Sequence, residues 1–229
     1  LVETLQTALA PEAIVFDLDG VLADVSRSQS TAIIETGRSF GIEIDVTDIE
    51  RAKANGNSND DWLLTQGLCR EKGTDVALDV VTDRYESLYQ GSNSKPGLKT
   101  HESPIVDGTT WARWASSRPL AVVTGRPRAD AEEFLDRFDL ARQVSALVTR
   151  DDAPLKPDPA PVSLALQLLG VRRAWMLGDT PDDLTAARAA GVIPIGVIAP
   201  GDDPKRSRLS LRNAARILEN TNQLEALLP

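Results

Sequence analysis

The sequence predicts an α/β protein in which helices cover both faces of a parallel sheet and a helical unit is inserted into the chain. Two observations predict this fold. Short apolar runs that suit strands buried on both faces alternate with segments of helical periodicity, which is the pattern of βαβ units. The interval 24–95 departs from the alternation, because it carries helical patterns only.

The alternating elements account for most of the chain, whose 229 residues are 41% hydrophobic and therefore sufficient for a substantial core. We expect buried strands at 13–16 (AIVF), 120–123 (LAVV), 145–148 (SALV), 174–177 (AWML) and 192–198 (VIPIGVI). Amphipathic helices are expected between them, at 109–117, 128–139, 159–169 and 182–190. The basic stretch 204–208 (PKRSR) is interpreted as a solvated loop or a minor partner contact.

The inserted interval divides the chain into two domains. It contains four helical segments, at 26–41, 47–56, 60–73 and 75–91, separated by glycine- and asparagine-containing breaks. We therefore expect a discontinuous core domain of residues 1–23 and 96–229 and a helical cap of residues 24–95. The stretch GSNSKPGLK at 91–99 is the expected hinge.

The composition narrows the environment and the partners. A net charge of −9 and a pI near 4.7 argue against nucleic acid or an anionic membrane as partner. The single cysteine, Cys69, excludes an internal disulfide and suits a buried core position. Because the sequence shows no signal-peptide pattern and no long apolar run, we expect a cytoplasmic protein. We further expect it to be a monomer or a weak homodimer.

Polar residues follow four of the predicted strands, where parallel α/β sheets bind ligands. In chain order they are Asp17 and Asp19, then Thr124, Gly125 and Arg126, then Lys156, and finally Asp179, Asp182 and Asp183. Carboxylates, a hydroxyl and a lysine together suit a divalent cation held by oxygens beside a phosphoryl group.

The spacing of these residues adds chemical detail. In an extended segment Asp17 and Asp19 point to the same side, so that one carboxylate can attack while the other manages a proton. Thr124 and Gly125 offer a hydroxyl and a backbone N–H to phosphate oxygens, and Lys156 offers a point cation.

Four motifs in this order resemble those of the haloacid dehalogenase-like superfamily of phosphotransferases. They are FDLDGVL at the first strand, VVTG at the second, then KPDP, and finally LGDTPDD. The resemblance implies a Rossmann-like core and a type-1 helical cap, as in the branch that holds phosphoglycolate phosphatase and β-phosphoglucomutase. An arginine, Arg126, follows the threonine of the second motif where many relatives have asparagine.

The resemblance assigns chemical roles to the motif residues. It implies that Asp17 is the nucleophile that forms an aspartyl-phosphate and that Asp19 is the acid and base. Thr124, Gly125 and Lys156 would then hold the phosphate.

The same resemblance implies a magnesium site. Mg²⁺ would be bound by Asp17, by the main-chain carbonyl of Asp19 and by Asp179. Asp183 would be a further ligand or would support the others, and whether Asp182 assists it is left open.

The predicted function is therefore a Mg²⁺-dependent phosphatase acting on a small soluble phosphate monoester. The alternatives are a phosphomutase of the β-phosphoglucomutase type and a non-catalytic phosphate-binding regulatory module. Asp19 counts against a dehalogenase, since that branch lacks the second acid of the first motif.

Residues outside the motifs are expected to select the substrate. The amide-rich loop 51–62 offers Lys53, Asn57 and Ser58 for substrate contact, although it could equally be a turn in which Asn59 or Asp60 caps a helix. Arg27, just past the hinge, and Arg126 either contact the substrate or are solvated or salt-bridged.

Overall fold

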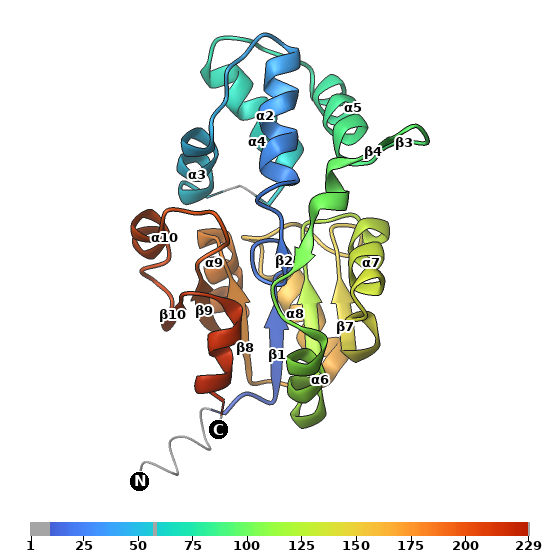
Figure 1. The fold of residues 1–229 in the computed structure, drawn as a ribbon. Coiled ribbons are helices and arrows are strands. Elements are labelled where there is room, and N and C mark those ends of the chain that lie inside the picture. Colours follow the sequence, from blue (N-terminus) through green and yellow to red (C-terminus); the bar gives the residue numbers. More distant parts are fainter. Residues whose placement is uncertain (1–9, 57–58, 229) are drawn as a thin grey trace.

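A six-stranded parallel sheet forms the core of the computed structural model, which describes residues 10–56 and 59–228 (Figure 1). In sheet order its strands are β10 (Arg216–Leu218), β9 (Ile193–Val197), β8 (Ala174–Gly178), β1 (Ala13–Phe16), β6 (Leu120–Val123) and β7 (Val144–Val148). β1 is central, paired with β8 on one side and with β6 on the other.

The central strands are apolar on both faces because both faces are covered. Along β1, Ile14 and Phe16 belong to one hydrophobic cluster, and Ala13 and Val15 belong to another on the opposite face. The predicted α/β fold is confirmed, and each of the five predicted strands is present.

Helices from different parts of the chain supply the two clusters. On the face of Phe16, α6 (Gly108–Ser117) and α7 (Arg128–Arg137) contribute residues that include Trp111 and Trp114. Both indole rings lie within 6 Å of the Phe16 ring by centroid distance. On the other face, α8 (Ala160–Leu169) and α9 (Pro181–Ala189) pack against the sheet.

A separate group of helices, called the cap below, lies beyond the carboxyl ends of the central strands (Figure 1). It consists of α2 (Gln29–Ser39), α3 (Val46–Ala54), α4 (Asp61–Glu71) and α5 (Leu78–Tyr89). The cap has its own hydrophobic cluster, in which Ile33, Leu68 and the buried Cys69 take part.

The segment 91–99 differs from the expected hinge. It forms a hairpin of β3 (Gly91–Ser92) and β4 (Lys95–Pro96) and enters a 3-10 helix, η1 (Leu98–His101), whose Leu98 packs against the cap cluster. The glycine-rich composition serves the hairpin, since Gly91 has φ +77°. The chain crosses between cap and core where β2 (Ala23–Asp24) pairs with β5 (Ser103–Pro104).

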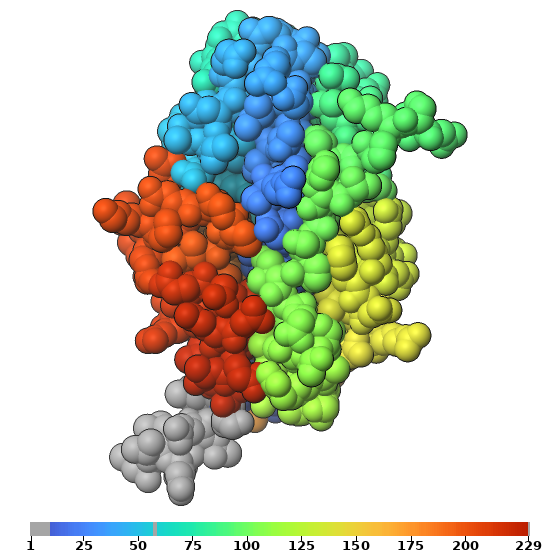
Figure 2. Space-filling view, viewed as in Figure 1, coloured from blue at the N-terminus to red at the C-terminus, as the bar shows by residue number. Residues whose placement is uncertain are grey.

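Residues 204–208 are also not the loop that was expected. They belong to α10 (Pro204–Ser210), where Pro204 occupies the first turn and Asp203 caps the helix by accepting hydrogen bonds from two backbone N–H groups. α10 packs against α3 of the cap, and the two regions lie against each other in Figure 2. The remaining 3-10 helices are η2 (Ala141–Gln143) and η3 (Thr221–Ala226). Among the described residues, no helix is both long and apolar enough to cross a membrane.

Candidate active site

Asp17 and Asp19 leave the end of β1 in a tight turn. The Asp17 N–H donates to the Leu177 carbonyl of β8 at 2.9 Å, so the ladder of the sheet extends to the first acid. Gly20 follows with φ +72°, and a Cβ there would lie 2.5 Å from Oδ2 of Asp179. Glycine is therefore required for the turn to pass beside that carboxylate.

Lys156 contacts residues from the ends of β1 and β6 and from the first turn of α9. Its buried Nζ donates to Asp17 Oδ1 at 2.6 Å and to the Val123 carbonyl at 3.2 Å, and it lies 2.6 Å from Asp183 Oδ1. One buried cation thus pairs with two buried carboxylates, an arrangement that keeps both in place because neither can be moved without leaving a charge unpaired.

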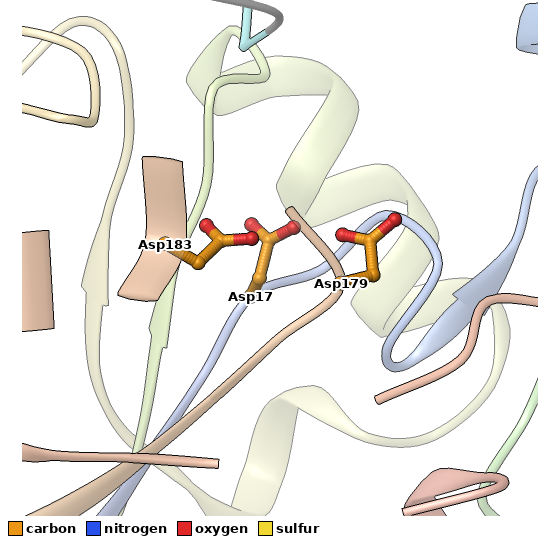
Figure 3. A group of neighbouring side chains, drawn as sticks. All are labelled: Asp17, Asp179 and Asp183. Atoms are coloured by element: carbon orange, nitrogen blue, oxygen red, sulfur yellow. The ribbon is translucent and has the colours of Figure 1, made fainter. Parts of the chain in front are cut away.

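Three acids converge at this point. Carboxylate oxygens of Asp17, Asp179 and Asp183 lie within 4.8 Å of one another, and Figure 3 shows Asp17 between the other two. Asp183 is oriented by the capping box of α9, in which its Oδ2 accepts from the Thr180 N–H at 3.0 Å and its own N–H donates to Thr180 Oγ1. Oxygen donors of this kind suit a hard divalent cation.

The electrostatics of the trio also fit a cation. Burial, together with the neighbouring charges of Asp183 and Asp19, raises the pKa of Asp17 to about 7 against the lowering effect of Lys156. Burial likewise raises the pKa of Asp179 well above its ordinary value, with only Lys53 opposing strongly. A divalent cation would lower both pKa values by stabilising the charged forms, so these residues fit Mg²⁺.

Asp19 is held by the arginine that departs from the family pattern. Arg126 donates to Asp19 Oδ1 through Nε at 2.8 Å and Nη2 at 2.5 Å, and its Nη1 donates to Glu102 Oε2 at 3.0 Å. Burial by itself raises the pKa of Asp19, but the charge and hydrogen bonds of Arg126 outweigh it and hold that pKa below its ordinary value. Arg126 is thus in a buried salt bridge, as one of its two predicted alternatives has it, and it also lines the cavity described below, so that substrate contact stays a prediction.

Thr124 and Gly125 lie directly under the cap. The Thr124 hydroxyl is buried and accepts from the Arg126 N–H at 3.1 Å. A Cβ on Gly125 would lie 2.4 Å from the carbonyl oxygen of Asn59, so a cap residue occupies the space above this glycine. The cap is therefore closed onto the second strand end.

Two further contacts hold the cap loop down. Asn59 Nδ2 donates to Asp182 Oδ2 at 3.1 Å, and Arg150 Nη2 donates to Asp60 Oδ2 at 2.5 Å. Asp60 also caps α4 through two backbone N–H groups, as one alternative for this loop predicted. Asp182 thus contacts the cap and is not among the three converging acids.

A cavity that is open to solvent lies between cap and core. Asp17, Asp19 and Asp179 line it from the core, and Lys53 lines it from the cap. Asn57 and Ser58 fall outside the described residues.

Arg27, the remaining candidate for substrate contact, does not face the cavity. Arg27 is exposed and is not among the described residues that line the cavity. Gln29, two positions later, is buried, lines the cavity and hydrogen-bonds Asp19.

Several lining residues have no counterpart in the sequence-based expectations. They are Asp61, Trp62, Tyr85, Glu86, Asp130 and Arg150. Asp61 and Trp62 are the last two residues of the suspected loop 51–62, although neither was singled out there as a substrate contact. Glu86 and Asp130 look like ordinary solvated acids of amphipathic helices, and only the packing of cap on core brings them to one cavity.

Comparison with known proteins places this geometry in a family. A model described as haloacid dehalogenase-like hydrolase matches residues 11–191. A Phytophthora nicotianae protein named imidazoleglycerol-phosphate dehydratase is 40% identical in an alignment of 197 positions that covers 82% of this chain and 44% of that protein. This chain therefore spans less than half the length of that relative.

Two further proteins resemble the chain over most of its length. The phosphoglycolate phosphatase of Escherichia coli strain K12 is 27% identical over 205 residues, with 80% of each chain covered. The crystal structure of a hydrolase from Pseudomonas syringae superposes with a TM-score of 0.72 at 21% identity, covering 95% of this chain and 100% of the other.

Proposed function

The chain belongs to the haloacid dehalogenase-like hydrolase family, and from this membership we propose that it is a Mg²⁺-dependent phosphatase of a small phosphate monoester. The observation that carries the proposal is the buried Lys156 between Asp17 and Asp183, under a cavity that Asp19 also lines. Two relatives are named for enzymes of small phosphorylated molecules, which agrees with this substrate class.

The first half-reaction transfers the phosphoryl group to the protein. A carboxylate oxygen of Asp17 attacks phosphorus, the bond from phosphorus to the alcohol oxygen breaks, and Asp19 gives that oxygen its proton. Lys156, 2.6 Å from Asp17 Oδ1, keeps the nucleophile oriented and offsets the repulsion between two anions.

The second half-reaction releases phosphate. Asp19 takes a proton from a water molecule, the resulting hydroxide attacks phosphorus, and the bond from phosphorus to Asp17 breaks. Arg126 lowers the pKa of Asp19, which keeps its carboxylate ionised and able to accept this proton. Asp19 is thereby returned to its protonated form for the next substrate.

The metal would be held by Asp17 and Asp179, with Asp183 and the main-chain carbonyl of Asp19 as further candidates. When bound, Mg²⁺ supplies positive charge that neutralises the phosphoryl oxygens and the attacking carboxylate. Thr124 and Gly125 would bind the phosphoryl oxygens from the end of β6.

The cap favours hydrolysis over a phosphomutase reaction. A mutase must hold a second phosphate in the cavity, yet the cap presents Asp61 and Glu86 there, with Lys53 as its cation among the described lining residues. Carboxylates at that position repel a second phosphate rather than anchor it.

Metal removal tests the metal assignment. We expect the purified protein to hydrolyse p-nitrophenyl phosphate with Mg²⁺ and to lose at least 100-fold in kcat in EDTA, with recovery on adding excess Mg²⁺. Activity that persists in EDTA would contradict the metal assignment.

Substitution of the nucleophile tests the covalent step. Asp17→Asn is expected to lower kcat at least 1000-fold, and rapid acid quenching of the native enzyme should trap a phosphorylated protein that this variant does not form. Near-native turnover by Asp17→Asn would exclude the aspartyl-phosphate route.

A further inference from the structure

Three carboxylates outside the four motifs, called the acidic wall below, line the cavity: Asp61, Glu86 and Asp130. Neutral groups hold each of them. Tyr85 Oη donates to Asp61 at 2.7 Å, Trp62 Nε1 donates to Glu86 at 3.0 Å, and Gln90 Nε2 donates to both Glu86 and Asp130 at 3.0 Å. In the described part of the chain, none of the three takes part in an ion pair.

The cations that line the cavity are committed to other groups. Arg126 pairs with Asp19 and Glu102, and Arg150 pairs with Asp60. The charge of Lys53 interacts most strongly with Asp179 and Asp202, and less strongly with Asp61 of the acidic wall. Among the described lining residues, six carboxylates thus stand against three cationic side chains.

An acidic wall opposes the binding of any phosphate ester, because the substrate brings a further negative charge into a partly desolvated cavity. A positive charge on the leaving alcohol would remove this repulsion. On the basis of the proposed phosphatase function, we propose that the substrate is a phosphate monoester whose leaving alcohol carries a protonated nitrogen, which the acidic wall binds.

The surroundings of the wall support a cation of this kind. The Arg150 guanidinium already lies 4.2 Å from the Trp62 ring centroid, so this part of the cavity accepts a planar cation against an aromatic face. Tyr85 and Tyr89 line the same region and offer further aromatic surface. Either an amine or an imidazolium fits this environment, and both belong to the proposed class.

The proposal is tested with esters that differ in charge. 2-Aminoethyl phosphate, 2-hydroxyethyl phosphate and phosphoglycolate are similar in size and carry a cationic, a neutral and an anionic leaving group. L-Histidinol phosphate adds a longer probe with both an amine and an imidazole. We expect kcat/KM for at least one cationic ester to exceed that for the neutral ester tenfold or more, with phosphoglycolate the poorest.

Variants test whether the acidic wall causes the preference for cationic esters. Asp61→Asn and Glu86→Gln are expected to reduce the ratio of cationic to neutral kcat/KM at least fivefold. Asp83→Asn is the matched control, since Asp83 is an exposed acid of the same helix as Glu86. It should leave the ratio within twofold. A ratio within one variant is independent of how much of that variant is folded.

The outcomes separate this proposal from the proposed function. If no ester and no p-nitrophenyl phosphate is hydrolysed with Mg²⁺, the phosphatase function itself fails. If p-nitrophenyl phosphate is hydrolysed but phosphoglycolate equals or exceeds both cationic esters, only the substrate class is overturned. An unchanged ratio in both wall variants would likewise overturn the role of the wall.

Discussion

The buried carboxyl of Asp61 lowers the free energy of unfolding when it is ionised. Burial raises its pKa to about 6, although Lys53 and the Tyr85 hydroxyl both act to lower it. A carboxyl with a raised pKa binds its proton more tightly in the folded chain than in the unfolded chain. Its contribution to the free energy of unfolding therefore decreases as the pH rises from about 4 to 6.

Removing this charge should stabilise the protein at neutral pH. We expect Asp61→Asn to increase the free energy of unfolding by roughly 1–2 kcal/mol at pH 7.5 and to change it little at pH 4, because the native carboxyl is then protonated. Urea unfolding at both pH values measures the effect. Asp83→Asn should produce no such pH-dependent difference, and equal gains at both pH values for Asp61→Asn would contradict the explanation.

The cap loop between α3 and α4 is the element that closes the cavity. Asn59 sits above Gly125 of the core, and Asp60 binds Arg150 while capping α4. One loop therefore orders the start of a cap helix and docks the cap on the strand ends. The absence of a side chain at Gly125 is what allows the backbone of the loop to approach.

A side chain at Gly125 should keep the loop from closing. Gly125→Ala would place a Cβ 2.4 Å from the Asn59 carbonyl oxygen, so we expect kcat/KM for p-nitrophenyl phosphate to fall tenfold or more. Gly67→Ala is the matched control, because a Cβ at this position in α4 meets nothing within 4 Å. It should retain native kcat/KM and add about 0.5–1 kcal/mol of stability. Equal activity of the two variants would exclude the closure argument.

At the scale of the molecule, the proposed metal site lies where the central strands, α9 and the cap come together. Asp17 and Asp179 follow central strands of the sheet, Asp183 begins α9, and Lys53 reaches the same region from the cap. A cation bound there would reduce the electrostatic repulsion among these buried carboxylates in the folded chain. Binding should therefore stabilise the whole chain.

Thermal unfolding measures this coupling. At Mg²⁺ about 100 times its Kd, binding contributes about 2.7 kcal/mol, which corresponds to a rise in Tm of roughly 5–10 °C for a chain of this size. Asp179→Asn should lose most of this response, and NaCl of equal ionic strength should not reproduce it in the native protein. A rise in Tm with Mg²⁺ in Asp179→Asn as large as in the native protein would show that the metal binds at another site.

The sequence by itself determined the features that depend on local pattern. The apolar runs that form β1, β6 and β8 are recognisable because strands buried on both faces need them, and Asp17, Lys156 and Asp179 are recognisable because they follow strand ends. β10, by contrast, has three residues at the sheet edge and leaves almost no pattern. The hinge segment 91–99 could not be separated from a hairpin, since both use the same turn residues.

Only the tertiary structure decided which distant residues share the cavity. Arg126 pairs with Asp19 and Glu102, which lie 107 and 24 positions earlier in the sequence, and no local sequence pattern predicts either ion pair. Glu86 and Asp130 have the periodicity of solvated helix faces, and they reach one cavity because the cap docks on the core. The residues at the strand ends are therefore predictable from local sequence, whereas the charge that surrounds the proposed leaving group is set by the packing of the cap on the core.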